Sequence, residues 1–249
     1  MITDSYDVKT PAVMHVSDFY GEQKHLCRTC IVTFSKEIYA HALARFPHEQ
    51  AGEIRACNGN TPLWLLDLDG QKIGFYLSHV GATAAATDVY EASWLLGAGN
   101  FILFGSAGAL QSEKTKNRFV LPDRAYRDEG MSYHYAPPAD YIAMKNADKI
   151  AAIFEELDVP YIRGGVWTTD AFYRETKGQV EARVREGCLA VEMELAGVQA
   201  VCDFHGFELY AFLQTGDILD SEVYEHAGLH GANHDLLKFD LALDIAKRI

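Results

Sequence analysis

The chain has 249 residues, and its 49% hydrophobic and 23% charged residues are typical of a packed globular protein rather than a disordered one. Acidic residues outnumber basic ones by 35 to 22, and the net charge of −13 disfavours a nucleic-acid partner, because such a surface requires clustered lysine and arginine. No apolar run reaches the ~20 residues that span a bilayer, no secretory leader is recognised, and five cysteines cannot all pair within one chain. We therefore expect a reduced, cytoplasmic protein that binds neither nucleic acid nor membrane.

Apolar β-branched runs alternate with segments of helical periodicity along the chain, with no linker or repeat between them. Ser35 is suited to cap a helix, Asp69-Gly70 is typical of a hairpin turn, and Gly97 favours a helix end. In chain order, the predicted strands are Cys30–Phe34, Leu63–Leu68, Ile73–His79, Phe101–Phe104, Tyr161–Val166 and Leu209–Leu213. The predicted helices are Lys36–Phe46, Thr83–Leu96, Asn146–Leu157, Glu192–His205 and Asn233–Lys247. This alternation indicates one α/β domain over residues 1–249.

Two segments near predicted strands carry groups suited to a small-molecule site. Gly105–Gly108 (GSAG) allows backbone N–H groups and the Ser106 hydroxyl to converge on a ligand, although small residues also serve simple turns. Glu192–Glu194 (EME) offers two carboxylates that can accept hydrogen bonds from a vicinal diol. The same two carboxylates would also favour the positive end of a helix.

Two further segments follow predicted strands. Asp217 lies just past an apolar strand, at the edge of a sheet where α/β proteins gather their ligands, but aspartate is equally common in turns. Phe172 and Tyr173 offer a stacking face for a planar base, whereas most aromatic side chains pack in a core. Each segment taken alone is a weak signal.

In combination and in this order, the segments resemble the nucleoside phosphorylase family, which includes hexameric purine nucleoside phosphorylases, uridine phosphorylases and related nucleosidases. The motifs that carry the resemblance are GSAGAL (Gly105–Leu110), RDEGMSYHYAPP (Arg127–Pro138), TTDAFYRE (Thr168–Glu175), VEMELAG (Val191–Gly197) and TGD (Thr215–Asp217). The resemblance implies a single three-layer α/β domain, with helices flanking a twisted mixed β-sheet. It also implies a homodimer, or a hexamer built as a trimer of dimers, whose active sites borrow side chains from a neighbouring subunit.

The resemblance assigns roles to the matched residues. Phe172 would stack near the base, and Asp217 would protonate a purine at N7. Cleavage of an N-glycosidic bond leaves negative charge on the departing base, which is why a general acid is needed there. His15 would be offered across the dimer to the ribose 5′-hydroxyl. The residues assigned to ribose binding are Glu192, Met193, Glu194 and His15.

The phosphate site departs from the family pattern. Phosphorylases of the family carry a Gly-Asp-Pro loop and a downstream arginine after the first strand, where this chain has Thr33–Glu37 (TFSKE). A second phosphate arginine stands two residues before the glycine motif, and that position is Leu103. A charge-assisted hydrogen bond contributes roughly 1.5–3 kcal/mol, so two lost arginine contacts represent about 3–6 kcal/mol, or ~10²–10⁴ in phosphate affinity.

Three functions follow from this departure. The first, which we expect, is phosphorolysis of a purine nucleoside or of several nucleosides to free base and ribose 1-phosphate. Phosphate would then be the co-substrate, held by Gly105, Ser106 and Lys36, and by Arg45 or Arg55 of a partner subunit. No organic cofactor is expected.

The second function is hydrolysis, in which water replaces phosphate and Glu37 acts as the general base of a nucleosidase. The third is nucleoside binding without turnover. Uracil specificity is disfavoured, because Thr176 and Gly178 stand where one uridine-specific group has glutamine and arginine.

No metal site is expected. Cys27 and Cys30 have the spacing of a zinc or redox pair, but no second pair follows and Cys30 enters a strand, which favours a structural role. The imidazoles of His226, His230 and His234 are four residues apart and would share one face of a helix. Two glycines among them disfavour a helix, so a loop or a pocket lid is predicted instead, and binding of nickel or zinc is left open.

Overall fold

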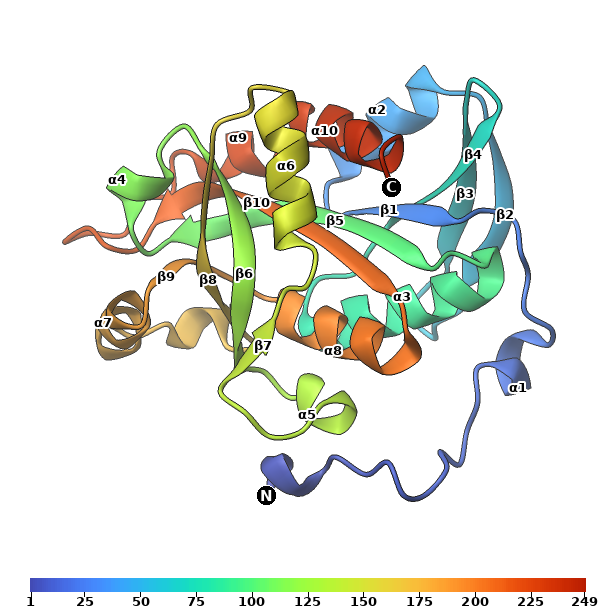
Figure 1. The fold of residues 1–249 in the computed structure, drawn as a ribbon, viewed down its shortest axis with the longest axis horizontal. Helices are drawn as coiled ribbons and strands as arrows, with labels where there is room; N and C mark the ends of the chain where they lie inside the picture. Colours follow the sequence, from blue (N-terminus) through green and yellow to red (C-terminus); the bar gives the residue numbers. More distant parts are fainter.

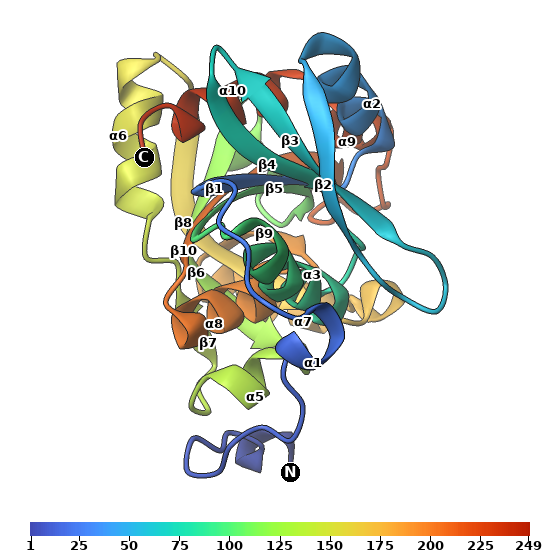
Figure 2. The same ribbon diagram turned by 90° about the vertical axis from the view of Figure 1, so that its right-hand side faces the viewer.

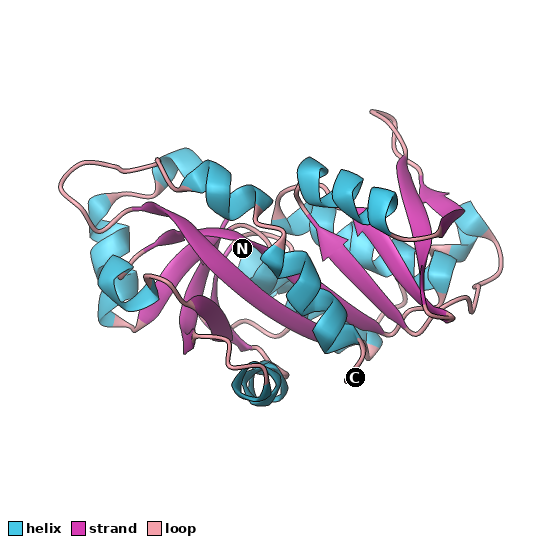
Figure 3. Cartoon of the chain, turned by 90° about the horizontal axis from the view of Figure 1, so that it is seen from above, coloured by secondary structure: helices cyan, strands magenta, loops and turns pink.

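Helices cover both faces of one ten-stranded mixed β-sheet in a computed structural model that describes residues 1–249 (Figure 1, Figure 3). The sheet has one hydrophobic core on each side, so the predicted α/β fold with helices flanking a mixed sheet is confirmed. The helices on one face are α3 (Ala82–Leu96) and α8 (Leu195–His205). Those on the other face are α2 (Lys36–Arg45), α6 (Ala147–Glu156) and α10 (Leu237–Ala246).

Part of the sheet closes on itself. The strand order is β10-β6-β8-β9-β5-β1-β4-β3-β2, β7 pairs with β6, and a further pairing of β10 with β5 joins five strands into a ring. The strands are β1 (Thr29–Thr33), β2 (His48–Ile54), β3 (Thr61–Leu68), β4 (Gln71–Leu77), β5 (Asn100–Ala109), β6 (Phe119–Asp128), β7 (Tyr141–Ala143), β8 (Tyr161–Thr169), β9 (Cys188–Glu192) and β10 (Glu208–Ile218).

The central strand β5 changes one of its neighbours along its length. Its first half pairs with β1, ending with Val32 opposite Leu103, and its far end pairs with β9, where Gly108 lies opposite Val191. The other side of β5 is paired with β10 throughout. A crevice therefore opens beside the middle of β5, between the point where β1 ends and the point where β9 begins. In α/β proteins such a change of neighbour is a typical place for a ligand.

The remaining helices are short, and the N-terminal segment is extended. These helices are η1 (Ile2–Asp4), α1 (Ser17–Tyr20), α4 (Ser112–Thr115), α5 (Ser132–Tyr135), η2 (Phe172–Arg174), α7 (Lys177–Arg185) and α9 (Leu229–His234). Residues 1–16 run along the outside of the molecule (Figure 2) and leave apolar side chains exposed, among them Val13 at 97%. None of the helices combines the length and the apolar character that crossing a membrane would demand.

The capping and turn residues recognised in the sequence begin and end the helices and strands as predicted. The hydroxyl of Ser35 accepts a hydrogen bond from the backbone N–H of Ile38 at 3.1 Å and so caps α2. Asp69 and Gly70 both have positive φ, at 53° and 92°, which forms the tight turn between β3 and β4. Gly97 ends α3 in the left-handed conformation.

Several elements differ from the prediction. The helix predicted from Glu192 begins at Leu195, because the preceding residues form the buried strand β9 between β8 and β5. The predicted C-terminal helix is interrupted at Asp235, and its main part is α10. The loop or lid predicted around His230 and His234 is wrong, because both residues lie on the short helix α9, which packs against β10. The strands β2, β6, β7 and β9 were not predicted. β6 contains Pro122 and four charged residues, so its sequence lacks the apolar pattern that predicts a buried strand.

Candidate active site

A cavity of about 280 Å³ lies in the crevice beside β5. The middle of β5 forms its floor, and the β1–α2, β9–α8 and β8–α7 connections, β10, α9 and α10 form its walls. The predicted site residues that line it are Gly105, Ser106, Phe172, Glu192, Met193, Glu194 and Asp217. Glu194 and Asp217 therefore share one cavity, which the resemblance requires of a ribose ligand and a general acid.

The two carboxylates of the β9–α8 connection have different hydrogen-bond partners. Glu192 Oε2 accepts the backbone N–H groups of Glu194 and Leu195, each at 2.7 Å, and its Oε1 accepts the hydroxyl of Thr168. Both oxygens of Glu192 are therefore used: Oε2 holds the start of α8 directly, and Oε1 binds the Thr168 hydroxyl, which itself accepts the N–H of Ala196. Glu194 accepts one hydrogen bond of standard geometry, from the N–H of Gly81 to Oε1 at 2.7 Å, and the nearby N–H of Met193 also lowers its pKa. No hydrogen bond of standard geometry reaches its Oε2, which is therefore available to a ligand.

Burial changes the ionisation of this pair. Removal from water raises the pKa of both carboxyl groups above the usual range, and the charge of Glu194 raises the pKa of Glu192 further. Gly81 stands at the N-terminus of α3, and its N–H stabilises the charged form of Glu194. The pair therefore titrates closer to neutrality than an exposed glutamate, and a cationic ligand would favour its ionised form.

Asp217 lies at the end of β10 and is 5% exposed. The hydroxyl of Tyr224 donates to its Oδ2 at 3.0 Å and orients the carboxyl group. Gly216, beside it, lets α9 approach β10, because a Cβ there would lie 2.7 Å from the Cβ of Ala232. Glu175 also lines the cavity, and burial, together with the charge of Asp217, raises the pKa of Glu175 to about 7.

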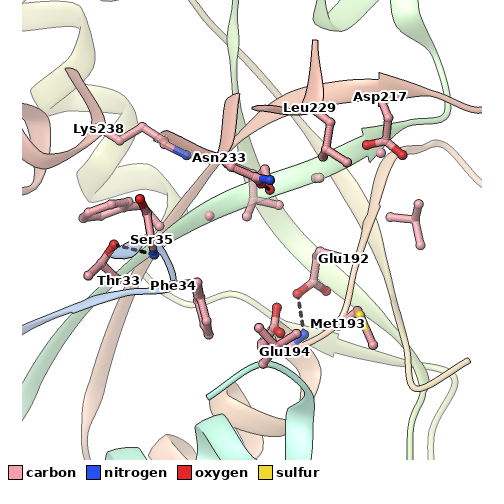
Figure 4. Close-up of a pocket in the computed structure, with 18 of the residues that line it drawn as sticks. Thr33, Phe34, Ser35, Glu192, Met193, Glu194, Asp217, Leu229, Asn233 and Lys238 are labelled. Atoms are coloured by element: carbon pink, nitrogen blue, oxygen red, sulfur yellow. Dashed lines mark hydrogen bonds between the residues drawn. The ribbon is translucent and has the colours of Figure 1, made fainter. Parts of the chain in front are cut away.

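The other end of the cavity is polar and carries a buried cation. Figure 4 shows Lys238 and Ser35 at this end and Asp217 at the opposite one. Lys238 is 1% exposed, and its ammonium group donates to the carbonyl of Ala232. Burial lowers its pKa to about 8, and the charge of Asp235, which forms no ion pair with it, opposes that shift. The ammonium group is therefore still protonated at pH 7 and lacks a counter-ion.

Hydroxyl and amide groups surround this cation. The Ser106 hydroxyl donates to the side-chain oxygen of Asn233, and the Ser35 hydroxyl lies 2.8 Å from Nδ1 of His234. No arginine lines the cavity, and Phe34 and Leu103 occupy its wall and floor. This end of the cavity therefore carries one positive charge, that of Lys238, and no arginine.

Two residues predicted for the phosphate or water site lie outside the cavity of their own chain. Lys36 and Glu37 occupy the first turn of α2 and are exposed, because Ile38 and Ala42 take the inward face of that helix. Neither residue lines the cavity. Arg45 and Arg55 also lie outside the cavity of their own chain.

His15 is exposed in the N-terminal segment and does not line the cavity of its own chain. Its backbone N–H donates to Asp18 Oδ2 at 2.8 Å, which leaves the imidazole free.

Lys238, Asn233 and Glu175 were not recognised in the sequence. Lys238 carries a visible signal, because a lysine at that position interrupts the apolar face of the C-terminal helix, which continues through Ala242 and Ile245. A lone lysine on an apolar helix face is rarely buried without a reason. Asn233 and Glu175 carry no such signal, since both stand in polar surroundings in the sequence.

The fold and the cavity define an α/β protein with a cavity suited to a small polar molecule, lined by buried carboxylates at a change of strand neighbour. Residues 28–243 match the sequence pattern of the phosphorylase superfamily, and the chain belongs to this family. The predicted family is thereby confirmed.

Relatives and solved structures that are similar to this chain cover most of it. A purine nucleoside phosphorylase DeoD-type of Jannaschia sp. is 31% identical over 176 residues, 68% of this chain and 72% of that protein. A guanosine phosphorylase of Halorubrum lacusprofundi is 30% identical over 189 residues, 70% of this chain and 77% of that one. The structure of futalosine hydrolase of Helicobacter pylori is similar with a TM-score of 0.70 and 17% identity, covering 88% of this chain and 98% of that one. This last likeness concerns the fold.

Proposed function

We propose that the protein cleaves the N-glycosidic bond of a purine nucleoside by phosphorolysis, with release of the base and ribose 1-phosphate. The observation that carries the proposal is one cavity that holds a carboxylate with a free oxygen, a second buried carboxyl group and an unpaired cation, provided by Glu194, Asp217 and Lys238. The relatives named as nucleoside phosphorylases support the same reaction class.

Glu194 binds the ribose in this proposal. Its free oxygen accepts hydrogen bonds from the vicinal hydroxyl groups, while Gly81 holds the other oxygen in place. A carboxylate beside the sugar also stabilises the positive charge that develops as the glycosidic bond breaks. Met193 lines the cavity next to it and offers an adaptable apolar surface to the sugar ring.

Asp217 provides the proton for the departing base, and this step requires that Asp217 be protonated in the nucleoside complex. As the bond from C1′ to the base breaks, its electron pair passes to the base, which takes the proton of Asp217 at N7 and leaves neutral. The Tyr224 hydroxyl remains bonded to Oδ2 and stabilises the carboxylate that results. Phe172 lines the same cavity and flanks the base.

Lys238 replaces the missing arginines as the cation that binds phosphate. One phosphate oxygen attacks C1′, and the ammonium group and the Ser35 hydroxyl hold the others. The Ser106 hydroxyl joins them when it turns from Asn233 to the phosphate. An unpaired buried ammonium group is costly to a protein, and an anionic ligand removes that cost.

Hydrolysis is the second candidate function, and the absence of arginine from the cavity lining favours it. In that reaction a water molecule takes the place of phosphate. The general base proposed for it, Glu37, lies outside the cavity, and this position weighs against the hydrolytic alternative.

We further propose that the active unit is a homodimer, alone or within a hexamer, in which His15 of one subunit reaches the ribose 5′-hydroxyl bound by the other. The exposed N-terminal segment that carries His15, with its exposed Val13 and Met14, supports this arrangement.

The direct test measures release of base from inosine, adenosine, guanosine and uridine, with and without phosphate, and identifies the sugar product. We expect phosphate-dependent release from the purine nucleosides, with ribose 1-phosphate as the product. Release at the same rate without phosphate would show hydrolysis, and binding without release would show a protein that does not turn over nucleosides.

Lys238→Met tests the phosphate site. We expect the KM for phosphate to rise by about tenfold or more, because a charge-assisted hydrogen bond is lost. The free energy of unfolding should stay equal or increase, because methionine fills similar volume without a buried charge. Lys36→Met, on the exposed face of α2, is the matched control and should change neither quantity. An unchanged KM in the Lys238 variant would contradict the assignment.

A further inference from the structure

Three possible metal ligands meet at the rim of the cavity, between α2 and α9. Glu37, His230 and His234 each offer one ligand atom, and these atoms all lie within 4.8 Å of one another. The rings of the two histidines have centroids 4.7 Å apart, and Nε2 of His234 lies 3.8 Å from Oε1 of Glu37. The proposed reaction uses none of these three side chains as a catalytic group.

Two neighbouring helices, α9 and α2, bring the three residues together. His230 and His234 are four residues apart on α9, so their side chains share one face of that helix. The helix is anchored by Ala232, which is 4% exposed and packs against Gly216. Glu37 stands in the first turn of α2, whose start is held by the Ser35 cap.

His234 is already oriented as a ligand. Its Nδ1 lies 2.8 Å from the hydroxyl of Ser35, which also accepts the N–H of Ile38. When Nδ1–H donates to Ser35, the tautomer is set and Nε2, which lies 3.8 Å from Oε1 of Glu37, carries the lone pair. Metal-binding histidines in proteins are held by a hydrogen bond at the second ring nitrogen in the same way.

The ligand distances fit a small divalent ion after modest side-chain movement. Zinc binds histidine nitrogen and carboxylate oxygen at about 2.0–2.2 Å, which places neighbouring ligand atoms of a tetrahedral site about 3.4 Å apart. The side chain of Glu37 is 60% exposed and His230 is exposed, so both can rotate toward His234, which is 25% exposed. Two imidazoles and one carboxylate form a donor set suited to zinc and nickel rather than to calcium or magnesium.

We propose that Glu37, His230 and His234 bind one divalent transition-metal ion, with Zn²⁺ as the reference ion, at the rim of the cavity. The ion ties α9 to α2 and leaves a coordination position open to solvent or to a ligand of the cavity. Because Leu229, Asn233 and His234 line the cavity from α9, the bound ion also holds that wall in place. The proposal does not depend on which reaction the cavity supports.

The test titrates ZnCl₂ into untagged, EDTA-treated and dialysed protein by calorimetry, in a buffer without phosphate. We expect a strong site with one ion per chain and an increase in Tm with added zinc. His230→Ala and Glu37→Gln should each weaken binding about tenfold or more and remove most of the Tm increase. Both positions are exposed, so both variants should fold, which is checked by their Tm without metal.

His226→Ala is the matched control. It belongs to the same series of histidines spaced by four, but it lies outside the cluster, with its ring 5.9 Å from that of Tyr224. We expect this variant to bind zinc as the unchanged protein does. Cys57→Ser is a second control, because Cys57 is an exposed thiol that can also bind zinc. No strong site, or equal losses in the His226 and His230 variants, would overturn the proposal.

Discussion

Two glutamates that stand two residues apart serve different purposes because their oxygens have different partners. Glu192 has three donors, of which two are the N–H groups at the start of α8, so its carboxylate holds a helix end. Glu194 has one donor and one free oxygen inside the cavity. The count of satisfied oxygens therefore assigns the ribose to Glu194 in the proposed reaction.

We expect Glu194→Gln to lower kcat/KM for base release about 10–10²-fold. The amide oxygen can still accept the N–H of Gly81, but the amide group lacks a second acceptor for a ribose hydroxyl and lacks the charge that faces a cationic sugar. Steady-state kinetics with a purine nucleoside measure the effect, and an unchanged Tm shows that folding is intact. A kcat/KM equal to that of the unchanged protein would remove Glu194 from the mechanism.

Glu175 makes stability depend on pH. Burial first, and the charge of Asp217 second, raise its pKa from an ordinary 4.5 to about 7. Because the folded pKa exceeds the unfolded one, this group contributes stability that is complete below about pH 4.5 and is lost as the pH rises through about 7.

Glu175→Gln should therefore reduce the decline in the free energy of unfolding between pH 5 and pH 8 by about 1 kcal/mol. This is less than the full shift would give, because the side chain is only partly buried and solvent screens it. Urea denaturation at both pH values measures the difference, with the exposed Glu222→Gln as control. Equal declines in all three proteins would contradict the expectation.

At the scale of the elements, two helices end alike but in different surroundings. Gly97 ends α3 with φ of 80°, and Gly206 ends α8 with φ of 75°, so both are left-handed. A Cβ at Gly97 would lie 2.5 Å from the carbonyl oxygen of Lys24, whereas a Cβ at Gly206 would meet no atom within 4 Å. The backbone of Lys24 cannot move away easily, because its N–H donates a hydrogen bond to the carbonyl of Trp94.

We expect Gly206→Ala to lower the free energy of unfolding by about 1 kcal/mol, which is the conformational penalty alone. Gly97→Ala should lower it by roughly 2–4 kcal/mol, because the steric collision adds to that penalty. Chemical denaturation of the two variants measures both values. Equal losses would mean that the segment around Lys24 moves aside at no cost.

At the scale of the whole molecule, the cavity of one chain lacks the histidine that the family resemblance assigns to the ribose. His15 is carried on an exposed N-terminal segment that runs outside the molecule (Figure 1). In the proposed dimer each subunit completes the site of the other, which is typical of a symmetric interface used twice.

Subunit mixing tests this arrangement. His15→Ala and Asp217→Asn are each expected to be strongly impaired as separate homodimers. When the two variants are refolded together, half of the dimers are mixed, and each mixed dimer has one complete site. We therefore expect recovery of about a quarter of the unchanged activity. Activity equal to the sum of the separate variants would show that His15 does not act across a subunit interface.

Local chemistry accounts for what was predictable in the fold. The six predicted strands and the start of α2 follow from apolar periodicity and from one capping hydroxyl, that of Ser35. The strand β9 and the late start of α8 were missed, because the sequence around Glu192 suits either a strand end or a first helical turn. Contacts with β8 and β5 decide between the two.

The candidate site was predictable where motifs are contiguous. Ser106, Glu194 and Asp217 belong to short motifs and do line one cavity. Lys36 and Glu37 were predicted to line it only because they follow the first strand. Both side chains are exposed to solvent, because Ile38 and Ala42 occupy the inward face of α2. Which residue of a first helical turn faces a cavity depends on the packing of the whole helix.

The sequence by itself determined the layered α/β class, the family and the order of the motifs, because these depend on residues that are neighbours along the chain. Only the tertiary structure decided which carboxylate has a free oxygen, that Lys238 is a buried cation beside Ser35, and that Glu37 meets two histidines of α9. The last two contacts join residues that are about two hundred positions apart in the sequence. Such contacts form only when the sheet closes and the C-terminal helices pack against β5 and β10.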